Sequence, residues 1–409
     1  MHVRSRQGRY SSRMPASSRR RALLLICAVA VATATNYTNH GPLLGFIRAE
    51  FGLSSADAGA IATAFFVGGA STMLAGGAIA DRIGTRPAVT LGFLLVVIAN
   101  LGTGLLASSF PALLAWRVLG GLGAGFGFAA GASYTRSIFD DRGRHLAQGL
   151  YGASFLLGSG ITLAYIPILA GQASDWRLAF TLSALAVAAV WVVWTLLAPS
   201  EPRAPAAHGA LAALAVALRE RNTWLLALCH MCGFGMAMVV GTWVTLYLAD
   251  VFGLTIAAAG LVGSLTLVTG IVARASGGVI LEGGVRPARL IRAGLALAAI
   301  GLTMMALAPA LPVAIVGLVV TGLGVGFPYA GVFNGAAASA PASPASAQAL
   351  VGWGGLTIAV VGPPLVGSLL DATGAFSAGF LALAAIVVAV LTLTSLVRPF
   401  DLNPAALEA

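Results

Sequence analysis

Three side chains that can carry a charge lie inside long apolar runs of the chain. They are Arg117, Arg274 and His230. A charge at the centre of a bilayer costs about 2.5–3.5 kcal/mol on insertion scales, so each of these residues is a candidate for ligand binding or proton transfer. An arginine without a carboxylate beside it favours a small anion, because the anion offsets the arginine's charge in a low-dielectric site.

Each of the three residues also has a structural explanation. Arg117 lies close enough to one end of its run to extend to the membrane interface. Arg274 precedes Gly277 by three residues, on a helix face where close packing is expected. The acidic residues all fall in loops or near the ends of the runs, so Arg117 and His230 remain the candidates for coupling transport to a proton. A lone histidine in a helix is also consistent with simple packing.

Other polar and aromatic residues in the runs are further candidates for contact with a substrate. These candidates are Asn36, Tyr37, Tyr151, Trp243, Tyr247, Tyr329, Asn334 and Trp353. The "CHMC" stretch at Cys229 has the spacing of metal ligands but lacks the further ligands that a metal site needs. We therefore predict neither a metal nor a cofactor.

The elements that position these residues are predicted to be membrane-spanning helices. The chain is 58% hydrophobic and 9% charged, against roughly 25% charged in a soluble domain. About twelve apolar runs are long enough to cross a hydrocarbon core of roughly 30 Å, and lipid forces such segments to be helical. The predicted fold is all-α, with spans near 22–41, 58–80, 87–108, 111–134, 146–170, 178–198, 223–249, 258–281, 290–308, 312–335, 346–370 and 377–397.

The positive charge follows the loops. The net charge is +10 and every basic residue is an arginine. Arginines gather before the first span and after every second span, which by the positive-inside rule predicts that both termini are cytoplasmic. This placement does not indicate nucleic-acid binding. The arginines concerned include Arg142, Arg144, Arg219, Arg221, Arg289 and Arg292.

An internal repeat divides the chain into two halves. Gly76 corresponds to Gly277 and Gly121 to Gly322, both at a spacing of 201 residues. We therefore predict two parallel six-helix bundles, 22–198 and 223–397, with a linker at 199–222 and cytoplasmic tails at 1–21 and 398–409. Parallel repeats in transporters place the substrate site near the midplane between the halves. Prolines at Pro328 and at Pro363–Pro364 are expected to kink spans ten and eleven.

A charge cluster after the second span carries a family resemblance. Gly77, Asp81, Arg82, Gly84 and Arg86 match a G-x-x-x-D-R-x-G-x-R loop. With this loop, the chain resembles the major facilitator superfamily of secondary transporters. Arg117 followed by "GGLGAG", and "DWRLAF" from Asp175, resemble two further motifs of that family. The resemblance implies transport by alternating access rather than enzyme activity.

The loop itself is predicted to act as a conformational latch. Asp81 lies at the C-terminal end of a helix, where the dipole disfavours an anion unless Arg82 or Arg86 offsets it. The latch would hold helix two against a neighbour in one state. The alternative is that these charges only set the topology. The second half keeps Glu282 and Arg286 but lacks an arginine beside the acid, so any second latch is weaker.

The cargo is less well defined. "ARASGG" around Arg274 resembles the eighth helix of anion-carrying members such as nitrate/nitrite porters and oxalate exchangers. Those members also carry an arginine in helix two, where this chain has Met73. Span five lacks the Gly-Pro pair of the family's antiporter motif, which counts against drug/proton exchange.

We therefore predict a transporter of a small organic or inorganic anion, with a coupling proton or counter-anion, in a bacterial inner membrane and acting as a monomer. The alternatives are proton-coupled export of hydrophobic compounds and, from another class, a membrane-embedded enzyme or sensor. The lipid bilayer is the other predicted partner.

Overall fold

The protein is a bundle of long apolar helices. A computed structural model describes residues 15–139, 141–173, 175–200 and 210–400; inside the helices, the surroundings of some residues, among them Gly77 and Asp81, also lie outside the described part. Twelve helical segments of the described chain are long and apolar enough to cross a membrane, and no strand forms in these residues. The predicted all-α fold with twelve spans is confirmed.

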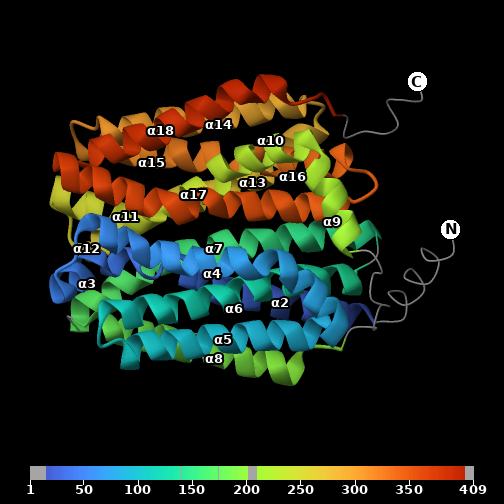
Figure 1. The fold of residues 1–409 in the computed structure, drawn as a ribbon, viewed down its shortest axis with the longest axis horizontal. Coiled ribbons are helices and arrows are strands. Elements are labelled where there is room, and N and C mark those ends of the chain that lie inside the picture. The colour runs from blue at the N-terminus through green and yellow to red at the C-terminus, as the bar shows by residue number, and fades with distance from the viewer. Residues whose placement is uncertain (1–14, 140, 174, 201–209, 401–409) are drawn as a thin grey trace.

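The first half lies in the lower part of Figure 1. Its elements are α2 (Ala16–Thr38), η1 (Gly41–Leu43), α3 (Leu44–Phe51), α4 (Ser55–Ile83), α5 (Thr85–Leu106), α6 (Phe110–Ile138), α7 (Asp141–Ala173) and α8 (Trp176–Leu197). The first three elements together make the first span, Ala16–Phe51.

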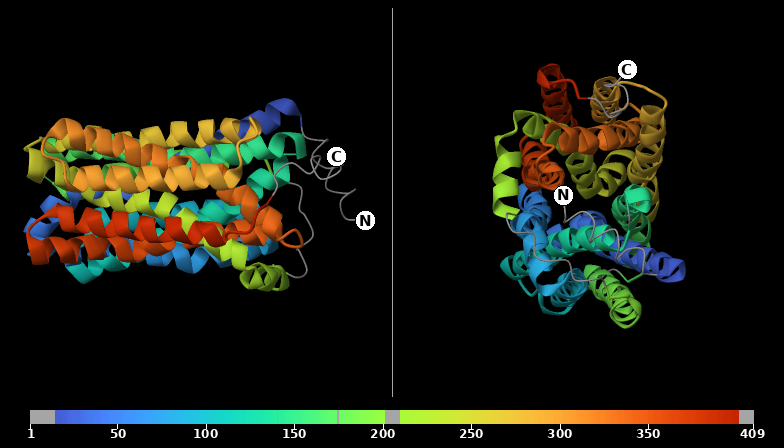
Figure 2. Two further views of the ribbon diagram at one scale, coloured as in Figure 1. Left: turned by 90° about the horizontal axis from the view of Figure 1, so that it is seen from above. Right: turned by 90° about the vertical axis from the view of Figure 1, so that its right-hand side faces the viewer.

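The second half lies above it in Figure 1, and the end-on view at the right of Figure 2 shows the two halves next to each other. Its elements are α9 (Ala210–Arg219), α10 (Arg221–His230), η2 (Met231–Gly235), α11 (Met236–Phe252), α12 (Ile256–Gly263), α13 (Leu265–Glu282), α14 (Pro287–Ala306), α15 (Leu311–Gly326), α16 (Pro328–Ser339), α17 (Pro344–Thr373), α18 (Phe376–Leu393) and η3 (Thr394–Leu396). The short helix α9 falls within the predicted linker.

The two ends of the bundle are distinguished by the chain termini. Residues 15 and 400 lie at the same end, which we call the terminal end; the opposite end, with α3 and the start of α12, is the far end (Figure 1). Helices at the far end begin at residues that can cap them. Ser54 accepts a hydrogen bond from the Asp57 amide at the start of α4, and Thr255 does the same for Ala258 at the start of α12.

Glycines allow matching close crossings in the two halves. A Cβ on Gly121 of α6 would overlap the carbonyl oxygen of Phe65 in α4. In the second half, a Cβ on Gly322 would overlap the carbonyl oxygen of Thr266. Phe65 and Thr266 are separated by 201 residues, the same spacing as the two glycines. The sequence repeat is thus also a repeat of backbone contacts between spans two and four and between spans eight and ten.

Two irregularities interrupt the spans of the second half. Met231–Gly235 forms a π-helix between α10 and α11. Span ten breaks at Phe327, between α15 and α16, because Pro328 has no N–H with which to continue the helical ladder. In span eleven, α17 continues as one helix through Pro363 and Pro364, where the kink stays a prediction.

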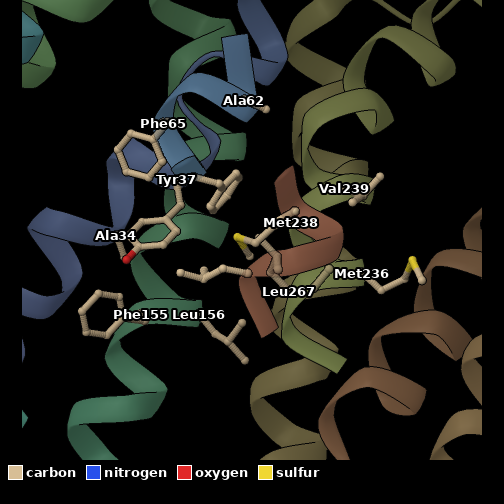
Figure 3. Packing of buried hydrophobic residues seen from close by; sticks show 14 of the residues in the cluster. Ala34, Tyr37, Ala62, Phe65, Phe155, Leu156, Met236, Met238, Val239 and Leu267 are labelled. Carbon is tan, nitrogen blue, oxygen red and sulfur yellow. The ribbon is translucent and has the colours of Figure 1, made fainter. Parts of the chain in front are cut away.

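The boundary between the halves is filled by apolar side chains. Figure 3 shows Tyr37 and Leu156 of the first half facing Met238 and Leu267 of the second, with Phe155 beside Tyr37 in the first half. Tyr37 is 7% exposed and the other four residues are no more than 4% exposed. The two halves therefore share one continuous buried core.

Candidate functional site

Arg274 of α13 lies over the ring of Tyr329 of α16. The guanidinium carbon is 4.2 Å from the ring centroid. Arg274 is half-buried, and its Nε atom is buried without a hydrogen-bond partner. No hydrogen bond or ion pair joins Arg274 to another residue in the described part of the chain. A cation–π contact stabilises a desolvated arginine only in part, so the positive charge remains available to a ligand.

Aromatic rings of the second half surround Tyr329. The Phe333 centroid lies 4.7 Å from that of Tyr329 and 4.8 Å from that of His230, and His230 stacks on Phe234 at 6.0 Å. His230 is buried and makes ring contacts with these aromatic residues. The three spans that meet here are seven, eight and ten.

The first half contributes a second group of aromatic residues across the boundary. The Tyr37 ring lies 6.1 Å from that of Phe234 and 5.9 Å from that of Phe155. Tyr151 lies 5.4 Å from Phe155 and donates a hydrogen bond to the carbonyl oxygen of Phe128. The neighbouring Gly152 has no side chain, and a Cβ there would lie 2.7 Å from the hydroxyl of Tyr329. Tyr329 therefore reaches to the surface of α7.

The local backbone explains how these residues come together. Tyr329 follows Pro328, so the break at Phe327 fixes where α16 restarts and how it presents its first turn. Phe234 lies inside the π-helix, whose wider turn inserts one extra residue relative to an α-helix; such turns are frequent at functional sites. Both irregularities lie beside the aromatic group around Arg274.

Arg117 forms a separate cluster nearer the far end. Its Nη1 donates to Oδ1 of Asn39 at 3.0 Å, and its Nη2 donates to the carbonyl oxygen of Asn36 at 3.0 Å. The same Nη2 lies 3.2 Å from Nδ1 of His40, and the guanidinium carbon lies 4.6 Å from the centre of the Phe65 ring. Arg117 is 3% exposed and has no carboxylate partner among the described residues.

Several members of this cluster, among them His40, Asn100 and Thr242, are not among the sequence-based candidates. Asn100 bonds with both Asn36 and Asn39, and Thr242 contacts His40 from the second half. Asn100 is a lone amide in an otherwise apolar span, which is a usable signal. Thr242 gives none, because a buried threonine usually bonds to its own helix.

The remaining predicted substrate contacts lie elsewhere. Trp243 donates to the carbonyl oxygen of Pro363, and Tyr247 donates to that of Met305, each among phenylalanines of the second half. Asn334 is exposed and Trp353 is half-buried. The structure brings together Arg274, Tyr329, His230, Tyr37 and Tyr151, and it places Asn36 with Arg117.

The latch is described only in part. The side chain of Asp81 and the surroundings of Gly77 lie outside the described part of the chain. Gly84 has a φ of 97° where α4 ends, and Arg86 donates to the carbonyl oxygen of Thr195 at 2.7 Å. Arg82 is exposed, as are Glu282 and Arg286 in the second half.

The known proteins to which this chain is similar are transporters. The chain is 26% identical to a probable nitrate/nitrite antiporter, NarK1, of Thermus thermophilus over 272 residues, which are 63% of this chain and 60% of that protein. It is 25% identical to a probable sulfoacetate transporter, SauU, of Cupriavidus necator over 64% of this chain and 63% of that protein. A third similarity, 34% identity over 124 residues, is to the multidrug resistance protein MdtL of Escherichia coli and covers 30% of this chain and 29% of that protein. Each alignment spans less than two thirds of the relative.

The fold has close counterparts among solved structures. A bacterial homologue of the human lysosomal transporter Spinster, in an inward-facing and unoccupied conformation, superposes with a TM-score of 0.76 at 17% identity, covering 94% of this chain and 96% of that one. Residues 25–347 match the family model of the Major Facilitator Superfamily. Together with the twelve spans and the repeated halves, this match shows that the chain belongs to the Major Facilitator Superfamily.

Proposed function

We propose that this transporter carries a small organic anion by alternating access and that Arg274 binds the anion. The observation that carries the proposal is the unpaired guanidinium of Arg274, over Tyr329 and at the boundary between the halves. When two parallel repeats rock against each other, a site at the boundary between them is exposed first to one side of the membrane and then to the other.

The charge of the site favours a single negative charge on the cargo. Arg274 is a lone cation with aromatic neighbours, and the equivalent position in the first half is Met73. The Met73 side chain lies against Gly352 of α17, where its methyl group would be 2.9 Å from a Cβ. An anion bound to one arginine exchanges its surrounding water for a single charged partner. A second negative charge on the cargo would lose its water without gaining a partner.

The rings favour an organic body on that anion. Tyr37, Phe234 and Phe333 offer apolar faces rather than hydrogen-bond donors. Nitrate is small and accepts hydrogen bonds on all sides, which these rings do not satisfy. The names of the relatives include an organic anion, sulfoacetate, which carries two negative charges, as well as the singly charged nitrate.

The membrane topology and the latch are part of the same proposal. Both termini lie in the cytoplasm of a bacterial cell, as the arginine distribution indicates. The first and second halves, 22–198 and 223–397, move relative to each other, and the Asp81 loop controls the closed state at the terminal end.

Uptake into liposomes tests the proposal. Purified full-length protein is reconstituted and offered labelled benzenesulfonate, methanesulfonate, nitrate or tetraphenylphosphonium. The sulfonates are strong acids, so they do not cross the lipid as neutral molecules. We expect benzenesulfonate to enter faster than into empty liposomes and faster than nitrate. If neither sulfonate enters above the empty-liposome rate, the proposal is wrong, even if nitrate enters. Entry of tetraphenylphosphonium alone would instead support the alternative of export of hydrophobic compounds, for a chain that is also similar to a multidrug resistance protein.

A further inference from the structure

A buried hydrogen-bonded chain crosses the boundary between the halves near the far end. It runs from Arg117 of α6 to His40, which lies between α2 and η1, and on to Thr242 of α11. His40 and Thr242 are both 0% exposed. Close by, a Cβ on Gly41 would lie 2.5 Å from the carbonyl oxygen of Gly241, so the two backbones meet directly.

The contacts fix the protonation state of His40. A guanidinium can only donate, so Nη2 of Arg117, 3.2 Å away, requires an unprotonated Nδ1 on His40. A neutral imidazole then carries its proton on Nε2, which lies 3.4 Å from Oγ1 of Thr242. The hydroxyl of Thr242 donates to the carbonyl oxygen of Met238 at 2.9 Å, which leaves its oxygen free to accept. All three contacts are satisfied by one tautomer of neutral His40.

A proton on His40 is incompatible with this arrangement. It would bind at Nδ1, the only free nitrogen, and would place an N–H against an N–H of Arg117. Two positive charges would then lie in contact inside the protein, where low dielectric makes their repulsion strong. Moving η1 away from α6 would separate the pair and would also pull His40 from Thr242.

Among the described residues, Arg117 is the one charged side chain that faces His40. Its own segment supplies Asn39 and Asn36, and α5 supplies Asn100 behind them. The facing helix α11 supplies Thr242, and the ring of Phe180 in α8 lies 5.8 Å from the guanidinium carbon of Arg117. No carboxylate in the described residues is paired with Arg117, so nothing nearby neutralises an added proton.

We infer that His40 is a proton-binding site, and that binding a proton there opens the far end by breaking the bridge from Arg117 to Thr242. The neutral state holds the far end closed. The inference goes beyond the proposed cargo, because it assigns a second ligand, the proton, to a cluster distinct from Arg274. It also differs from the sequence-based coupling candidate His230, which contacts aromatic rings.

The test measures the distance between the halves at the far end without any substrate. Nitroxide labels are placed by S108C and L307C, at exposed loop positions in the first and second half, in a chain whose Cys27, Cys229 and Cys232 are replaced by alanine or serine. Pulsed electron paramagnetic resonance then gives the label distances from pH 8.5 to pH 4.5. We expect a longer distance to appear at low pH, with the open-to-closed ratio changing by up to about tenfold per pH unit, the limit for one proton.

Two substitutions decide which histidine responds. In H40Q, the amide can accept from Arg117 and donate to Thr242 but cannot take up a proton, so the short distance should persist at every pH. H230Q is the matched control and should respond as the parent does. The inference is overturned if the parent shows no pH response, if H40Q responds as the parent does, or if H230Q loses the response.

A third variant covers the case in which H40Q does not fold. T242V keeps His40 and Arg117 but removes the acceptor from the second half, so the longer distance should already appear at pH 8.5. An unchanged short distance in T242V would show that the bridge does not hold the far end closed. Because no anion is added, these outcomes are independent of the role of Arg274.

Discussion

The carboxylate of Asp371 accepts a hydrogen bond from the backbone amide of Ser55 across the boundary between the halves. Oδ1 of Asp371 lies 2.9 Å from the Ser55 nitrogen, and Oδ2 lies 2.9 Å from the Ala56 nitrogen. Asp371 is near the end of α17, and the two amides begin α4. An acid of one half thus satisfies the free amides of a helix in the other half.

We predict that D371N weakens the closure of the far end. The amide keeps one acceptor oxygen but loses the charge that favours a helix N-terminus. Because such an interaction at an exposed helix end contributes about 0.3–1 kcal/mol, the closed-to-open ratio should fall about two- to fivefold. The label pair described above, at pH 8.5, provides the measurement. D57N is the control, since Asp57 is an acid of the same turn whose side chain bonds with Ser54 of its own half.

Removing the charge of Arg274 should reduce anion binding. In R274Q the charge-assisted contact with the anion is lost, and because such bonds contribute about 1.5–3 kcal/mol, the dissociation constant should rise about tenfold or more. R274K keeps the charge without the planar group that lies over Tyr329, so its loss should be smaller. Binding is measured by equilibrium dialysis with benzenesulfonate. R289Q removes an exposed arginine of α14 and should bind normally; equal binding by R274Q and the parent would exclude Arg274 from the site.

The contact between Tyr329 and Gly152 predicts a rescue. G152A places a methyl group 2.7 Å from the Tyr329 hydroxyl, so the ring must shift away from α7 and transport should fall. Y329F removes that hydroxyl, and the nearest ring carbon is then 3.6 Å from the methyl group, an ordinary contact. The double variant G152A/Y329F should therefore transport better than G152A.

The control for the rescue lies one turn earlier on the same helix. A Cβ on Gly149 meets no other atom within 4 Å, so G149A should be neutral. If the double variant transports no better than G152A, the loss of transport in G152A does not come from a clash with the Tyr329 hydroxyl.

The repeated glycine crossings should be equally important for stability in both halves. G121A and G322A each place a methyl group against a backbone carbonyl of the neighbouring helix, and backbone cannot move aside as a side chain can. We expect both variants to lower the melting temperature in detergent by several degrees, because overpacking typically costs about 1–3 kcal/mol. G278A, where a Cβ meets nothing within 4 Å, should melt as the parent does. A large loss in only one of the two variants would mean that the halves do not share this contact.

Much of the fold follows from local patterns that a sequence displays. Runs of about 20 apolar residues give the spans, and matched glycines 201 residues apart give the two halves. Pro328 predicts the break in span ten because the missing N–H is a local property. Pro363 and Pro364 lie in a span that stays helical, since neighbouring helices can satisfy the freed backbone groups.

The candidate site is less predictable because its contacts are not local. Arg274 and Tyr329 are 55 positions apart, and this spacing does not predict that their side chains are in contact. Tyr247 and Trp243 look like binding residues in sequence, yet their polar atoms bond to backbone carbonyl oxygens of other helices. In a sequence, a tyrosine or tryptophan whose polar atom bonds to a carbonyl oxygen cannot be distinguished from one whose polar atom bonds to a cargo.

The repeat also reveals what the two halves do not share. The positions that correspond to Arg274 and Tyr329 in the first half are Met73 and Phe128, while the glycine crossings are retained in both. The glycine crossings were therefore kept in both halves, whereas the proposed binding positions diverged: the second half has the charge of Arg274, and the first half has apolar side chains at the corresponding positions. Substitutions meant to change the cargo should therefore be made first in the second half alone. Substitutions meant to change the speed of the transport cycle can be made in either half.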